Sequence, residues 1–182
     1  MRTEAFGIGG LGGHFTMKGI KTIEEIIDHL GPEIDMHSRL HGQWESVADG
    51  IIARHKHWGP ADIIVLVGHS WGAKRVVEIS QRLYSYGIYV DYAAGIDPTR
   101  LLSGEMRVPH NVKDVDEFWA TSGVVARGRS SGAPGCKYVY DHDWSGTKKV
   151  TVIPGGHIAC AKNKKTHGMI KSKVDALLRA AE

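Results

Sequence analysis

The sequence has few cysteines and no long apolar run, and these two absences exclude several classes of protein. Two cysteines, Cys136 and Cys160, provide neither a disulfide framework nor the spacing of a zinc site, and the sequence does not decide whether they pair. The apolar runs are far shorter than the ~18 residues that a membrane-crossing helix requires. Because the N-terminus also lacks the pattern of a secretory signal, we expect a cytoplasmic protein without integral membrane association.

Neither sign of charge is in large excess. The formal net charge is only +3, from 23 basic and 20 acidic residues, so the chain carries no general excess of positive charge for nucleic acid. One local cluster is basic, and it consists of Lys162, Lys164, Lys165, Lys171 and Lys173. We interpret it as the solvated side of a C-terminal helix, and we expect no nucleic-acid partner. The oligomeric state stays open.

Apolar periodicity predicts strands that alternate with helices. The expected strands span residues 4–8, 34–40, 62–67, 88–96, 112–119, 137–140 and 150–153. The expected helices begin at a capping box of Thr22 and Glu25, near residue 42, after residue 70 and before Ile170. A chain of 182 residues with this alternation predicts a single α/β domain with a mostly parallel sheet flanked by helices.

The most informative motif is Gly-His-Ser-Trp-Gly at residues 68–72. It follows a buried apolar strand and precedes a helical stretch, which is the context of a nucleophile elbow. A sharp turn there raises the hydroxyl of Ser70 above the sheet, where a histidine can remove its proton. The two glycines allow the strained turn and the close approach of helix to strand. An ordinary strand-to-helix loop is the alternative that this context disfavours.

A serine nucleophile requires a histidine as base and a carboxylate that orients it. Among eleven histidines we favour His157, in a turn after the last predicted strand, and keep His167 as the alternative. Asp97 follows the strand after the elbow's helix, so its carboxylate should emerge beside Ser70 at the carboxyl ends of the strands. Asp141 and Asp143 are the alternative acids. With His142 they make only a weak metal motif, and we expect no metal and no cofactor.

The oxyanion that forms during acyl transfer needs preorganised N–H donors. We expect one from the amide of Trp71, directly after the nucleophile. The second should come from the glycine-rich loop at residues 7–13, with Gly10 and Leu11 as the candidates. The same loop could cradle a phosphate, but neither the dinucleotide spacing nor a Gly-Lys-Ser/Thr ending is present.

Together these residues resemble the α/β-hydrolase superfamily, and specifically a small lipase-like or esterase-like member without a large cap. The resemblance rests on the elbow, the glycine-rich loop before His14, the Ile-Asp-Pro segment at residues 96–98 and the Pro-Gly-Gly-His segment at residues 154–157. It implies hydrolysis of a small-molecule carboxylic ester through an acyl-enzyme. Ser70 would attack, His157 would carry the proton, and Asp97 would orient His157. It also implies an exposed site, with residues 123–135 as a short flap.

Two other functions compete with this hypothesis. One is a catalytically inactive, hydrolase-like binding module, which the order Ser, Asp, His after successive strands disfavours. The other is a serine hydrolase that acts on an amide or a thioester, which the same residues can cleave. Substrate choice depends on pocket shape and leaves no motif in the sequence.

Overall fold

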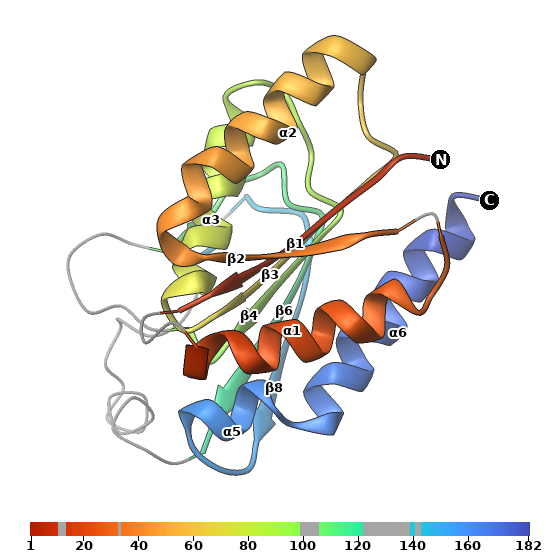
Figure 1. Ribbon diagram of the computed structural model, residues 1–182. Coiled ribbons are helices and arrows are strands. Elements are labelled where there is room, and N and C mark those ends of the chain that lie inside the picture. The colour runs from red at the N-terminus through yellow and green to blue at the C-terminus, as the bar shows by residue number, and fades with distance from the viewer. Residues whose placement is uncertain (11–13, 33, 99–105, 122–138, 141–142) are drawn as a thin grey trace.

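Six parallel strands form one sheet at the centre of the computed structural model, and helices cover both of its faces (Figure 1). The structure describes residues 1–182 except 11–13, 33, 99–105, 122–138 and 141–142. The strand order is β2-β1-β3-β4-β6-β8. This architecture confirms the predicted α/β class with a parallel sheet flanked by helices.

The elements have the following bounds. The strands of the sheet are β1 (Thr3–Gly9), β2 (Met36–Leu40), β3 (Ile63–His69), β4 (Tyr92–Ile96), β6 (Asp114–Ala120) and β8 (Thr147–Ile153). Two short strands, β5 (Arg107–Val108) and β7 (Val139–Tyr140), pair in parallel as a separate sheet. The α-helices are α1 (His14–Asp28), α2 (Trp44–Trp58), α3 (Trp71–Tyr84), α5 (His157–Ala161) and α6 (Lys164–Ala180), and a short 3-10 helix spans His41–Gln43.

Each face of the sheet buries its own apolar cluster. Helices α2 and α3 pack on one face, and α1, α5 and α6 pack on the other (Figure 1). Strand β3 is buried at every one of its seven positions, as an apolar strand covered on both sides should be. Among the described residues, no helix is both long and apolar enough to cross a membrane.

The first helix begins earlier than the sequence predicted. Thr22 is not an N-cap: it lies inside α1, and its hydroxyl donates to the carbonyl oxygen of Lys18 one turn back, at 3.0 Å. The buried stripe of α1 already starts at Met17 and Ile20. Gly19 resembles a helix breaker in the sequence, but a Cβ there would lie only 2.5 Å from the Ala161 oxygen. This glycine therefore lets α1 and α5 pack closely.

The predicted glycine loop is also partly wrong. Gly7 and Gly9 belong to β1, where added Cβ atoms would lie 2.4 Å from Ile20 and 2.2 Å from Met17. These glycines admit α1 against the strand instead of making a loop. Strand β4 is shorter than the predicted 88–96, because Val90 forms only an isolated bridge with Val112. The predicted flap at 123–135 and Cys136 lie outside the described residues, and Cys160 is buried.

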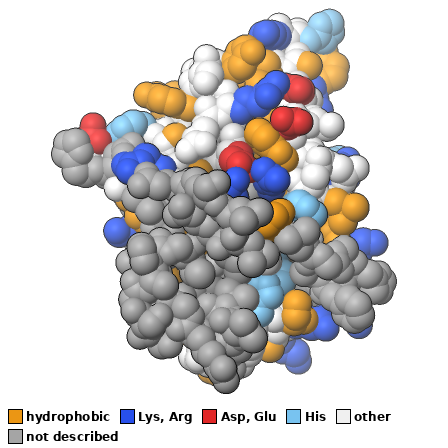
Figure 2. All heavy atoms as spheres, turned by 90° about the vertical axis from the view of Figure 1, so that its left-hand side faces the viewer, with side chains coloured by type: hydrophobic (Ala, Val, Ile, Leu, Met, Phe, Trp, Pro, Cys, Tyr) orange, Lys and Arg blue, Asp and Glu red, His pale blue; other side chains and the backbone are white. Residues whose placement is uncertain are grey.

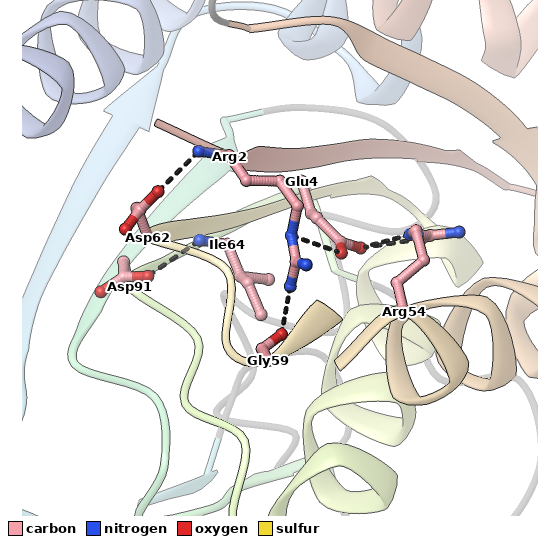
Figure 3. A network of polar contacts seen from close by, with 7 residues as sticks. All are labelled: Arg2, Glu4, Arg54, Gly59, Asp62, Ile64 and Asp91. Carbon is pink, nitrogen blue, oxygen red and sulfur yellow. Dashed lines mark hydrogen bonds and ion pairs between the residues drawn. The ribbon is translucent and has the colours of Figure 1, made fainter. Parts of the chain in front are cut away.

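A polar network joins the first strand to the connection before β3, at the edge where the strands begin (Figure 3). Its members are Arg2, Glu4, Arg54, Gly59, Asp62, Ile64 and Asp91. The Glu4 side chain is 5% exposed and accepts two hydrogen bonds from Arg54, at 2.7 and 3.1 Å. The main-chain nitrogen of Arg2 donates to Asp62 at 2.6 Å. This network fixes the start of β1, which lies at the edge of the sheet opposite the carboxyl ends of the strands.

Candidate active site

Ser70 occupies a strained turn between β3 and α3. Its main chain has φ 59° and ψ −121°, a conformation that residues with a side chain rarely adopt. Among the described non-glycine residues, positive φ occurs at Ser70 and at Asp97, where φ is 44°. The Ser70 hydroxyl does not cap α3, although Ser70 stands at the N-cap position. The turn therefore gives this side chain an orientation other than that of an ordinary helix start.

The two glycines of the motif are required by packing. A Cβ at position 68 would lie 2.4 Å from the Gly72 oxygen, and one at position 72 would lie 1.9 Å from the Ile8 oxygen. Both distances are shorter than any real Cβ contact. Helix α3 thus begins in direct contact with the main chains of β3 and β1, and this contact gives the turn its sharpness.

Strand register brings Ser70 and Asp97 to the same height at the edge of the sheet. His69 pairs with Ile96 across β3 and β4, so Ser70 and Asp97 are the next residues of two neighbouring strands. The amide of Ser70 donates to the Ile96 oxygen at 2.9 Å and continues the ladder by one step. Their proximity follows from the parallel sheet and is independent of loop conformation.

Asp97 and His157 form a partly buried hydrogen-bonded pair. His157 Nδ1 lies 2.6 Å from Asp97 Oδ2, and the other carboxylate oxygen accepts from the Ala120 amide at 2.9 Å. Asp97 is fully buried, whereas the His157 side chain is 20% exposed. Because a carboxylate accepts hydrogen bonds, it holds the proton of neutral His157 on Nδ1 and leaves Nε2 unprotonated.

A tight turn carries His157 back over the sheet. After β8, Gly155 adopts φ +105° and donates its amide to the Thr121 hydroxyl at 3.1 Å. His157 is then the first residue of α5, whereas the sequence analysis placed it within the turn. The structure therefore joins Ser70, Asp97 and His157 at one edge through β3, β4 and β8.

The alternative residues lie elsewhere. His167 is buried in the first turns of α6, where its Nε2 lies 2.6 Å from the Ala161 oxygen. Asp143 is 62% exposed and lies 3.6 Å from His110. Asp141 lies outside the described residues. The structure thus brings together the residues that the sequence analysis favoured and places His167 and Asp143 in other contacts.

Two of the three predicted oxyanion donors belong to residues that the structure describes. A Cβ at Gly10 would lie 2.7 Å from Ser70 Cβ and 3.1 Å from Ser70 Oγ, so the main chain at Gly10 passes directly beside the serine. Trp71 is the first residue of α3, and amides in the first turn of a helix have no intrahelical acceptor. Leu11 lies outside the described residues. The main chain at Gly10 and the start of α3 at Trp71 thus both lie next to Ser70.

Sequence reasoning missed His69. It is fully buried at the end of β3, its Nε2 lies 3.2 Å from the His157 carbonyl oxygen, and the two ring centroids are 4.5 Å apart. Its position inside the Gly-His-Ser-Trp-Gly motif, on a strand covered on both faces, was the available signal. The partner is 88 residues away along the chain, so spacing could not identify the contact.

Figure 2 looks onto the edge where the strands end, and described histidine side chains reach the surface there beside hydrophobic ones. Among the described residues, no group of three or more His, Cys, Asp or Glu side chains is arranged to hold a metal ion.

A parallel sheet with a strained serine between strand and helix defines the α/β-hydrolase fold, and comparison with solved structures gives the same result. Human thioesterase 2 matches with a TM-score of 0.57 and 11% identity over 100% of this chain and 98% of that one. Est1E from Butyrivibrio proteoclasticus matches with a TM-score of 0.58 and 13% identity, over 99% and 88%. A Xanthomonas campestris protein assigned to the α/β-hydrolase superfamily matches with a TM-score of 0.55 and 13% identity, over 99% of each chain.

These likenesses establish the fold: the chain has the α/β-hydrolase fold, as the resemblance implied. No protein-family model matches the sequence, and no curated protein is detectably similar to it.

Proposed function

We propose that this protein is a serine hydrolase that cleaves a carboxylic ester of a small molecule through an acyl-enzyme. The observation that carries the proposal is the partly buried Asp97–His157 hydrogen bond at the edge where Ser70 occupies its strained turn. An ordinary strand-to-helix loop has no need of such a pair. A binding module without turnover has no need of it either, since the arrangement orients a base next to a hydroxyl.

The chemistry proceeds in two acyl transfers. His157 Nε2 removes the Ser70 proton as Oγ attacks the ester carbonyl, and the amides of Gly10 and Trp71 donate to the oxyanion. The tetrahedral intermediate collapses when His157 gives its proton to the leaving alcohol. A water then attacks the acyl-enzyme, with His157 again taking the proton. Acid is released and Ser70 recovers its hydrogen.

The Asp97 carboxylate faces the charge that this cycle places on the base. When His157 becomes an imidazolium, the Asp97 carboxylate lies 2.6 Å from its Nδ1 in a fully buried position. The two strands that supply Ser70 and Asp97 are rigid, so little reorganisation is needed during the reaction.

A thioester is the second candidate substrate. The favouring observation is that human thioesterase 2 and the type II thioesterase BorB from the borrelidin biosynthetic cluster both share the fold over at least 92% of their own chains. The same serine, histidine and oxyanion donors act on either bond. A matched pair of substrates with one acyl group and either an oxygen or a sulfur leaving atom separates the two activities.

The test is hydrolysis of p-nitrophenyl acetate together with labelling by a fluorophosphonate probe. Wild type should hydrolyse the ester and take up the probe, and Ser70→Ala should lose both. Ser85→Ala serves as the control, because Ser85 is at the end of α3 and its hydroxyl donates only to the Gln81 carbonyl in an exposed position. Absence of labelling in wild type would refute the hydrolase proposal.

A second pair of variants assigns the base. His157→Ala should reduce kcat by at least about 10³-fold, the usual size of a triad deletion. His167→Ala should only weaken activity, because His167 holds the α5–α6 corner through Ala161. Comparable activity in both variants would contradict the assignment of His157.

A further inference from the structure

We propose that His69, the second residue of the Gly-His-Ser-Trp-Gly motif, is a positioning residue for His157. The inference rests on the proposed function, since it assigns a role to the residue behind the base. Two contacts between the residues support it: the hydrogen bond from His69 to the His157 carbonyl and the close approach of the two rings.

His157 has few other constraints. It is the first residue of a five-residue helix that follows a turn with Gly155 at φ +105° and Gly156 at its N-cap. The amide of Gly155 ties the turn to the Thr121 hydroxyl and Asp97 holds the imidazole at Nδ1, but a single hydrogen bond does not fix the orientation of the ring about that contact. A base in this position needs a second point of attachment.

His69 provides that attachment from a rigid element. It is fully buried and pairs in register with Ile96, so β3 and β4 fix its main chain. Its Nε2 lies 3.2 Å from the His157 carbonyl oxygen. Because a carbonyl oxygen can only accept, Nε2 must carry the proton, and His69 therefore restrains the main chain from which the catalytic ring extends.

The ring of His69 also supports the ring of His157. The centroids lie 4.5 Å apart and the planes are inclined by 30°, so one imidazole covers a face of the other. With Asp97 at the Nδ1 edge and His69 at one face, His157 is restrained in two directions. The remaining edge carries Nε2, which under the proposed function is the atom that takes the Ser70 proton.

One element thus carries both the nucleophile and the support of its base. Ser70 follows His69 directly, so any movement of the end of β3 shifts the serine and the histidine support together. This coupling keeps the spacing between the attacking oxygen and the base constant, which matters because small displacements of reacting groups cost large factors in rate.

The experiment compares His69→Gln with His69→Asn. A glutamine amide nitrogen reaches the place of imidazole Nε2 and keeps the hydrogen bond to the His157 carbonyl, whereas an asparagine amide reaches only the place of Nδ1. Both variants lose the ring, so their difference isolates the hydrogen bond. We expect kcat for p-nitrophenyl acetate to fall about tenfold in the Asn variant and less than about threefold in the Gln variant, with KM unchanged.

Proton NMR gives a readout that does not depend on turnover. The His157 Nδ1 proton, held between nitrogen and the Asp97 carboxylate, should give a low-field resonance in wild type and in the Gln variant, and should broaden or vanish in the Asn variant. Wild-type kcat in the Asn variant, equal losses in both variants, or an unchanged resonance in all three proteins would overturn the inference.

The failure of this inference differs from the failure of the proposed function. If wild type neither hydrolyses the ester nor takes up the fluorophosphonate probe, the hydrolase proposal fails, and the NMR comparison alone decides the role of His69. If wild type is active and the Asn variant matches it in kcat and in its resonance, the hydrolase proposal stands and only His69 loses its role.

Discussion

Two residues of the candidate active site adopt main-chain conformations that are energetically unfavourable. Ser70 and Asp97 keep positive φ values, which cost about 1–3 kcal/mol each unless the surroundings enforce them. Here the amides of both residues continue the sheet, donating to Ile96 and Phe118 at 2.9 and 2.6 Å. The regular ladder offsets the strain, and both side chains leave the sheet edge at angles that an ordinary strand end would not give.

The carboxyl group of Asp116, away from the candidate active site, is unfavourable for a different reason. Burial raises the pKa of Asp116 on β6 above the ordinary value of 3.8; the hydrogen bond from the Tyr92 hydroxyl lowers it, and the nearby carboxylate of Asp114 raises it. The folded protein therefore binds this proton more tightly than the unfolded chain does. The stability that this one group contributes is fully present below pH 3.8 and is lost as the pH rises through its folded pKa.

Asp116→Asn should for this reason be more stable than wild type at pH 7, because it removes a buried charge and keeps an oxygen that accepts from Tyr92. The advantage should shrink towards pH 3.8, where the carboxyl is half protonated in the unfolded chain and more than half protonated in folded wild type. Urea unfolding at the two pH values measures the effect. Asp35→Asn is the control, because its side chain is 75% exposed. A lower stability of Asp116→Asn than of wild type at pH 7 would contradict the predicted direction of the stability change.

Sequence alone could locate Ser70, since its signal is local: two glycines and a serine between a strand and a helix. It could favour Asp97 and His157 because parallel strands align their carboxyl ends. It could not identify His69 or the Ala120 amide that holds Asp97, because these contacts join residues that are distant along the chain and depend on register. Register is a property of the folded sheet.

At the scale of elements, glycines determine how closely helices approach strands. Helix α1 packs closely on β1 and α5 because Gly7, Gly9 and Gly19 have no side chains. Helix α3 packs closely on β3 and β1 because Gly68 and Gly72 have none. The sequence analysis treated the early glycines as a loop and placed the start of α1 at Thr22. Local propensity gives the wrong answer there, because tertiary packing favours glycine inside regular structure.

Gly72→Ala should destabilise the fold by about 1–3 kcal/mol, because its methyl group would lie 1.9 Å from the Ile8 carbonyl oxygen and the main chains must separate. Gly168→Ala on α6 is the matched control. A Cβ there meets nothing within 4 Å, so alanine should stabilise the helix by about 0.5–1 kcal/mol.

Denaturant unfolding of both variants checks these opposite signs. Equal changes in the two proteins would contradict the assignment of a packing role to Gly72.

The whole molecule separates its two polar centres. The strands begin at the Arg2–Glu4–Arg54 network and end at Ser70, Asp97 and His157, so the apolar sheet lies between them (Figures 1 and 3). We expect the Arg2–Glu4–Arg54 network to stabilise the fold and the Ser70 edge to carry the catalytic activity. Substitutions in one should have little effect on the other.

Glu4→Gln tests this separation. It removes the charge that Arg54 faces at 2.7 Å, and should cost about 2 kcal/mol of unfolding free energy, less than a fully buried pair because the Arg54 side chain is 35% exposed. Asp49→Asn breaks the exposed pair with Arg82 and should cost less than about 0.5 kcal/mol. Thermal unfolding measures both costs.

Ester turnover by folded Glu4→Gln should equal that of wild type. A large loss of kcat with intact folding would show that the two edges communicate.

The position of the chain ends has a practical consequence. Met1 is half exposed, and both termini lie on the side of the molecule from which the strands start (Figure 1). An affinity tag, a fluorophore or a bead joined at either end would therefore hang behind the sheet, and immobilised protein should meet its substrate with the serine edge facing outward.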